Sequence, residues 1–144
     1  MTDRPELVHD RGKIFDAIRE RRITAEQLQS SDLYYKIADR INMLPLLESI
    51  LDSNDTIFKY NRKLNAYSVI KADYIMKNNV EERNVFLFLT QNGHERKYCC
   101  RSFFPQDKID YTKNQASWTL LYKKKVNLST GEEEILYDRL KKCP

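Results

Sequence analysis

The sequence predicts an α+β fold in which N-terminal helices pack on one antiparallel sheet of five to six strands. Apolar residues recur at helical spacing in the first third of the chain, and from Thr56 onward the period changes from about 3.6 residues to about 2. The pair Asn92-Gly93, a strong signal for a β-hairpin, directly follows the most apolar stretch. With 144 residues the chain has the size of a single domain, and we expect residues 1–54 to form its helical part and residues 55–144 its sheet.

The composition limits the classes of protein to which the chain can belong. Its net charge of +4 is too small to identify a nucleic-acid-binding protein, so the distribution of the charges has to decide. No apolar run approaches the ~20 residues that a membrane-spanning helix needs, and we expect a cytoplasmic protein with no membrane contact. Glycine loops of the GxGxxG or GxxxxGK type are absent, and so is a GxSxG nucleophile motif.

The three cysteines, Cys99, Cys100 and Cys143, predict neither a disulfide framework nor a metal site. An odd number of cysteines is typical of free thiols in a reducing compartment. Neighbouring residues on a strand point to opposite faces, so Cys99 and Cys100 are poorly placed to share a metal ion. We therefore expect no metal and no cofactor, and we expect this pair of thiols to be small buried groups.

Helices should fill the chain up to the turn cluster at residues 52–55. Thr24 and Gln27 have the spacing of a capping box, which predicts a helical turn that starts near Thr24. The next helix has one apolar face and should break at Leu44, because Pro45 disfavours the helical conformation of the residue before it. A short helix should follow from Pro45.

The remainder of the chain has the pattern of strands. Residues 85–89 are apolar on both faces, which predicts a strand that is covered from both sides. Pro105 should end the hairpin, because proline cannot donate to the ladder of hydrogen bonds. Residues 105–117 form a polar loop that is long enough to suggest a function. The predicted strands are residues 56–64, residues 67–77, the two arms of the hairpin over residues 84–104, residues 118–126 and residues 132–138.

A two-residue turn at Asn92-Gly93 fixes the expected register of the hairpin. It places Gln91 opposite His94 and Leu87 opposite Tyr98, and a slip of one residue would exchange the two faces. One face then carries cations among aromatic rings, and we interpret it as the working surface: Phe86, Phe88, Lys97, Cys99 and Arg101. The other face is more apolar and is expected to lie under the helices: Val85, Leu87, Leu89, Tyr98, Cys100 and Ser102.

Cations and tyrosines alternate along the predicted strands. Cations neutralise phosphates and aromatic faces stack on bases, so this pattern predicts a surface that binds RNA. The alternative is that these charges keep an exposed sheet from aggregating. Arg101 is flanked by Cys100 and Ser102-Phe103-Phe104, a poor place for a solvated charge, and this favours a role in binding a ligand or in an ion pair. The cations are Lys59, Arg62, Lys71, Lys97, Arg101 and Lys123, and the tyrosines are Tyr60, Tyr74, Tyr98, Tyr111 and Tyr122.

Two further polar features are candidates for the chemistry. His94, at the expected tip of the hairpin, is either a solvated turn residue or a general acid or base that reaches a ligand on the sheet. The loop from Asp110 to Gln115 offers a carboxylate, a phenol, a hydroxyl and an amide, which could orient a phosphate or a ribose hydroxyl. In the alternative interpretation, Asp110 caps a short turn and Gln115 bonds to the backbone.

A series of motifs covers most of the chain. They are Phe-Leu-Phe-Leu at 86–89, Cys-Arg-Ser-Phe-Phe at 100–104, Asp-Tyr-Thr-x-x-Gln at 110–115 and Leu-Leu-Tyr-Lys at 120–123, preceded by a helical pattern over 23–45, by Phe-Lys-Tyr-Asn at 58–61 and by Ala-Asp-Tyr at 72–74. In this order and spacing, the chain resembles the fourth of the phage-encoded barnase/EndoU/colicin/RelE-like nuclease families.

The resemblance implies a protein of phage or mobile-element origin, with helices packed on an antiparallel sheet and RNA as its partner. It implies RNA cleavage without a metal, in which a base activates the ribose 2′-hydroxyl and cations stabilise the phosphorane. With the surface described above, it gives the catalytic candidates Lys59, Tyr60, His94, Arg101, Thr112 and Gln115. The candidates for binding RNA are Arg62, Lys71, Lys97, Ser102, Asp110, Tyr111 and Lys123.

Two other functions stay open. Members of the family have an upstream segment of the form His-x-x-Gly-Leu-His, which this sequence lacks. If that segment supplies a catalytic histidine, the expected alternative is an inactive nuclease-fold protein that binds RNA or a host protein, as a phage-encoded inhibitor would. A third alternative is a structural or regulatory module without a nucleic-acid partner.

Overall fold

The structure is a computed structural model that describes residues 16–32, 34–93 and 96–141. The chain divides into two compact units, an N-terminal unit Met1–Ile41 and a C-terminal unit Asn42–Pro144. The prediction of a single domain whose helical part ends at residue 54 stays a prediction.

The N-terminal unit contains short helices. Helix α3 (Ala25–Gln29) begins with the predicted capping box at Thr24. The Thr24 hydroxyl accepts from the N–H of Gln27 at 3.3 Å, and the Gln27 side chain accepts from the N–H of Thr24 at 3.0 Å. The capping box therefore satisfies two N–H groups that a helix start leaves without partners. Helix η1 (Tyr34–Lys36) and the start of α4 (Ala38–Met43) follow.

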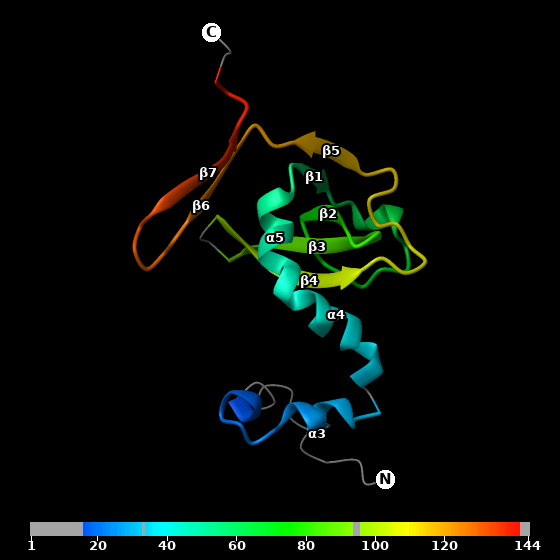
Figure 1. Ribbon diagram of the computed structural model, residues 1–144. Helices are drawn as coiled ribbons and strands as arrows, with labels where there is room; N and C mark the ends of the chain where they lie inside the picture. The colour runs from blue at the N-terminus through cyan, green and yellow to red at the C-terminus, as the bar shows by residue number, and fades with distance from the viewer. Residues whose placement is uncertain (1–15, 33, 94–95, 142–144) are drawn as a thin grey trace. The chain divides into compact units, whose positions relative to one another are not determined.

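Two helices of the C-terminal unit precede its sheet. Helix α4 ends at Met43, and η2 (Leu44–Leu46) carries Pro45, so the predicted break before the proline is confirmed. Helix α5 (Leu47–Ser53) then buries Ile50, which is 2% exposed. Helix α5 lies across one face of the sheet (Figure 1).

The five-stranded sheet is antiparallel and has the strand order β4-β3-β2-β1-β5 (Figure 1). Its strands are β1 (Thr56–Lys59), β2 (Tyr74–Val80), β3 (Arg83–Asn92), β4 (Lys97–Pro105) and β5 (Ala116–Thr119). A separate hairpin pairs β6 (Tyr122–Val126) with β7 (Glu133–Asp138). The α+β fold and a sheet of five strands are thus confirmed, but the predicted strand over residues 118–126 is divided between the two sheets. Helix η3 (Arg62–Leu64) occupies part of the β1–β2 connection.

Strand β3 is buried on both faces, as its two-sided apolar pattern predicts. Val85 and Leu87 lie on the helix side, in a cluster with Met43, Ile50, Met76 and Phe103. Phe86 and Phe88 lie on the opposite side, in a second cluster with Tyr60 and Ile75 against which Phe104 and Tyr111 pack. The interpretation of the Phe86 and Phe88 face as an open working surface is therefore wrong, because both rings are fully buried.

The register of the β3–β4 hairpin also differs from the prediction. Asn92 pairs with Lys97, so four residues rather than two connect the strands. A bulge places Arg101 as an extra residue between the pairs Leu89–Cys100 and Phe88–Ser102. The bulge moves Ser102 to the Phe88 face, while Cys100 stays with Leu89 on the helix side.

The two-residue turn lies instead between β2 and β3. Val80 pairs with Arg83, and the intervening Glu81 and Glu82 have φ values of 48° and 64°. Left-handed conformations at both central positions are what a tight hairpin turn requires, although such turns favour Asn and Gly. The sequence signal at Asn92-Gly93 therefore lies in the β3–β4 connection, which is longer than the two-residue turn between β2 and β3.

We predict that Phe88→Ala lowers the free energy of unfolding by about 3–5 kcal/mol, because it removes a fully buried ring and leaves a cavity. The matched change Tyr98→Ala should cost much less, because that ring is 47% exposed. Urea denaturation of both variants measures the difference. Equal losses would contradict the assignment of the Phe88 face to the core.

Candidate functional site

One end of the five-stranded sheet brings together most of the predicted site residues. Strands β1 and β3 end there, and β2, β4 and β5 begin there. Lys59 is the last residue of β1, Tyr74 is the first of β2 and pairs with it, and Lys97 is the first of β4. We call this part of the molecule the site end of the sheet. Antiparallel pairing places these residues there although they are far apart in the sequence.

Three aromatic side chains form a group on the helix-side face at the site end, and we call them the aromatic platform: Tyr74, Tyr98 and Trp118. The ring centroid of Tyr74 lies 5.4 Å from that of Tyr98 and 5.8 Å from that of Trp118. The ammonium group of Lys59 lies 4.5 Å from the centroid of Tyr74, within the range of a cation–π interaction. Desolvation, the neighbouring Tyr74 phenol and the Asp73 carboxylate raise the pKa of Tyr98.

Exposed cations surround the same end of the sheet. Arg62 donates from Nε to the carbonyl of Ser68 at 3.0 Å, and the other N–H groups of its guanidinium take no part in this bond. Lys71 lies in the same β1–β2 connection, and Lys97 begins β4. The side chains of Lys71 and Arg101 are exposed and have no ion-pair or hydrogen-bond partner among the residues that the structure describes. Strand pairing places Lys59 and Lys97 at the site end, and the Asp73 carboxylate, which accepts from the N–H of Gln91 at 2.8 Å, lies there too.

Three of the predicted catalytic residues are buried and bonded inside the protein. The Tyr60 hydroxyl donates to the Ser68 hydroxyl at 2.9 Å. The Gln115 side chain accepts from the N–H of Asn61 at 2.8 Å and donates to its carbonyl at 3.2 Å, which matches the alternative in which Gln115 bonds to the backbone. Thr112 is 7% exposed. All three are thus held by bonds within the protein, and their catalytic role stays a prediction.

Asp110 is held by two partners on the side of the sheet opposite the aromatic platform. Its carboxylate accepts from the Lys77 ammonium at 2.9 Å and from the Thr112 hydroxyl at 2.6 Å. Its Oδ1 also accepts from the N–H of Thr112, as in a short capped turn. Partial burial raises the pKa of Asp110, but the hydrogen bonds from Lys77 and Thr112 outweigh it and lower the pKa below its ordinary value.

The predicted site residues therefore lie on two faces of the sheet. Lys59 shares the helix-side face with the aromatic platform, whereas Tyr60 and Tyr111 pack on the Phe86 and Phe88 rings of the other face. Burial raises the pKa of the Tyr111 phenol. Ser102 pairs with Phe88 and belongs to this second face. The residues do not converge on one surface as a single catalytic cluster.

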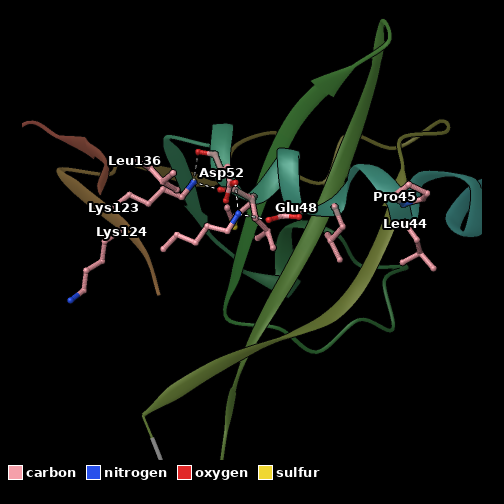
Figure 2. A pocket seen from close by; sticks show the side chains of 11 residues that line it. Leu44, Pro45, Glu48, Asp52, Lys123, Lys124 and Leu136 are labelled. Carbon is pink, nitrogen blue, oxygen red and sulfur yellow. Dashed lines mark hydrogen bonds and ion pairs between the residues drawn. The ribbon is translucent and has the colours of Figure 1, made fainter. Parts of the chain in front are cut away.

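Lys123 lies away from the site end, beside a groove of about 560 Å³ between α5 and the β6–β7 hairpin (Figure 2). Its ammonium group donates to the carbonyls of Leu51, Asp52 and Asn54 at the end of α5. Figure 2 shows Lys123 directed at this helix end, while Lys124 points away. Burial lowers the pKa of Lys123. Its contacts are those of a helix cap rather than of a phosphate-binding group.

The predictions for His94 and for the two cysteines of the hairpin have different outcomes. His94 lies outside the described residues, so its role stays a prediction. Cys99 and Cys100 are free thiols and both are exposed, which contradicts the expectation of buried groups. The Cys100 thiol is nevertheless partly screened from water, and this partial desolvation and the neighbouring Cys99 raise its pKa.

Trp118 is the member of the platform that the sequence interpretation missed. Its position depends on the pairing of β5 with β1, where Trp118 lies opposite Ile57. The available signal was the alternation of Trp118 with polar neighbours at the start of the predicted strand over residues 118–126.

The comparison with protein families identifies the family to which the chain belongs. The family model described as phage-Barnase-EndoU-ColicinE5/D-RelE like nuclease4 matches residues 3–140. The chain belongs to this family. Membership in this phage nuclease-like family confirms the resemblance drawn from the motifs, over nearly the whole chain. Neither curated proteins nor solved structures gave a significant match.

The described part of this member of the nuclease-like family carries neither a candidate membrane-spanning helix nor a candidate metal cluster. Among the described residues, no helix is both long enough and apolar enough to span a bilayer. Within residues 16–32, 34–93 and 96–141, no three His, Cys, Asp or Glu side chains are grouped so that they could hold a metal ion.

We predict that Asp110 stabilises the fold in a pH-dependent manner. Because the folded state lowers the pKa of its carboxyl, the stabilisation is present above the unfolded pKa of about 3.9 and is lost as the pH falls through the lower folded value. Wild type should therefore be more stable than Asp110→Asn at neutral pH, and the two should converge toward pH 3 and below. Denaturation at a series of pH values measures this, and a difference that stays constant would contradict it.

Proposed function

We propose that this chain acts on RNA as a ribonuclease that needs no metal, and that the site end of the sheet binds the substrate. The observation that carries the proposal is the aromatic platform with the Lys59 ammonium stacked on it. Aromatic faces stack on bases and cations neutralise phosphates, which is the combination that RNA requires. Membership in a nuclease-like family supports cleavage in addition to binding.

The chemistry of the proposal is transesterification within the RNA. The ribose 2′-oxygen loses its proton to a base and attacks the phosphorus, and the bond from phosphorus to the 5′-oxygen breaks as that oxygen gains a proton. The products are a 2′,3′-cyclic phosphate and a 5′-hydroxyl, so no water or cofactor is consumed. Lys59 and Arg101 are assigned to stabilise the negative charge of the phosphorane. His94 is retained as the candidate acid or base.

Tyr60, Thr112 and Gln115 act in this proposal as positioning residues. Gln115 joins the β4–β5 loop to Asn61, two residues after Lys59 in the chain. Tyr60 holds the β1–β2 connection through Ser68. Their substitution should disturb the position of Lys59 rather than remove a group that touches RNA.

We predict that the purified protein cleaves total RNA or tRNA in the presence of excess EDTA. Arg101→Ala and Lys59→Ala should each lower the rate by about 100-fold or more, the loss typical of a group that stabilises transition-state charge. Lys108→Ala is the matched control, because Lys108 is an exposed cation beyond the far end of β4. The 2′,3′-cyclic end of the product identifies the reaction.

Intact RNA at high protein concentration would overturn the proposed cleavage. Cleavage that depends on added Mg²⁺ would overturn the metal-independent mechanism. Equal rates for wild type and Arg101→Ala would remove Arg101 from the site.

A second candidate function is RNA binding without cleavage. It is favoured by the burial of Tyr60, Thr112 and Gln115, three predicted catalytic residues that are each at most 9% exposed. We predict for this case that RNA is retained intact and that the affinity falls steeply with salt, by a slope of about 0.7 for each phosphate that is neutralised. Lys59→Ala should reduce the slope by about that amount. Affinity that does not change with salt would exclude phosphate contacts as the basis of binding.

A further inference from the structure

The aromatic platform has an arrangement that a general cationic surface does not need. Tyr74 lies in the middle, and Tyr98 and Trp118 lie on either side of it, each within 6 Å. The Lys59 ammonium sits against the central ring. A positive charge therefore lies against the central ring, on the face of the sheet that also carries the two outer rings.

The two outer rings are open to solvent. Trp118 is 51% exposed and Tyr98 is 47% exposed. The rings are inclined at 71° between Tyr98 and Tyr74 and at 55° between Trp118 and Tyr74, so the three do not stack on one another face to face. Each outer ring thus has surface left for a flat partner. Burying an aromatic face against a base removes apolar area from water and gives stacking energy.

The spacing of charge and rings suits a segment of single-stranded RNA. In such a segment, one phosphate joins two nucleotides whose bases can turn outward onto separate aromatic groups. In a duplex the bases are stacked on each other, and aromatic side chains of a flat sheet cannot reach their faces. An acidic protein surface could pair with Lys59, but it would not supply two flat groups on either side of the charge.

We infer that the aromatic platform binds two adjacent unpaired nucleotides, one base against Trp118 and the other against Tyr98, with the phosphate between them at Lys59. This inference rests on the proposed function, because it names the class of substrate for that site. It makes Trp118 and Tyr98 determinants of specificity for single-stranded RNA. Lys59 contacts the phosphate that joins the two nucleotides.

Trp118 allows a direct test because it is the only tryptophan in the chain. The probe is a 2′-O-methyl RNA hexanucleotide, whose blocked 2′-oxygens prevent cleavage. It should quench the fluorescence of Trp118, and the same strand annealed to its complement should bind at least about 10-fold more weakly. Tyr98→Leu should weaken binding of the single strand by about 10-fold, the effect of losing one stacked base.

Matched variants separate stacking from folding. Tyr35→Leu is the control for Tyr98→Leu, since Tyr35 is an exposed tyrosine in helix η1 of the N-terminal unit, and this variant should bind the hexanucleotide as wild type does. Fluorescence anisotropy of a labelled hexanucleotide should show that Trp118→Phe retains most of the affinity and that Trp118→Leu loses it.

The outcomes distinguish this inference from the proposed catalysis. If RNA stays intact but the hexanucleotide quenches Trp118 and prefers the single-stranded form, the ribonuclease proposal fails and the platform stands. If RNA is cleaved but duplex and single strand bind equally, or Tyr98→Leu binds as wild type does, the platform inference fails and the ribonuclease proposal stands. Absence of any quenching of Trp118 by the hexanucleotide overturns the inference.

Discussion

The burial of β3 from both sides is the constraint on which the C-terminal unit depends. Helices α5 and η2 cover Val85 and Leu87, but they can cover only one face of the sheet. The second layer has to come from the connections between strands, which place Tyr60 and Tyr111 against Phe86 and Phe88. Polar groups carried into that layer need partners there, because burial without a hydrogen bond is costly. The β4–β5 loop is accordingly fixed by internal hydrogen bonds.

This constraint explains why three residues that were predicted to be catalytic are buried and hydrogen-bonded within the protein. Tyr60, Thr112 and Gln115 have the chemical types that nuclease sites use, but the same types serve to anchor a loop on a sheet. Residue type alone does not distinguish the two uses, because the difference lies in exposure and in hydrogen-bond partners. The groups that remain open are on the other face, where α5 does not cover Lys59, Tyr98 and Trp118.

Local signals in the sequence predicted the parts of the fold that are set locally. The capping box at Thr24, the break before Pro45 and the two-sided burial of β3 each depend on a few neighbouring residues. The register of the hairpin does not, because it depends on the four-residue connection between β3 and β4 and on the bulge at Arg101. The role of Lys123 depends on carbonyl groups some 70 positions earlier in the chain. The role of Trp118 depends on the pairing of β5 with β1, two strands that are neighbours in the sheet but not in the sequence. Such long-range relations leave no pattern in a short window.

The bulge at Arg101 also divides strand β4 into two parts. In each part, the alternation of side chains between the two faces of the sheet is set separately. The part from Ser102 to Pro105 is fixed by the packing of Phe103 and Phe104 in the two cores. The part from Lys97 to Cys100 follows the hairpin connection instead. An insertion or deletion in that connection can be absorbed at the bulge before it reaches the core. A change in the length of that connection therefore need not alter how Phe103 and Phe104 pack in the two cores.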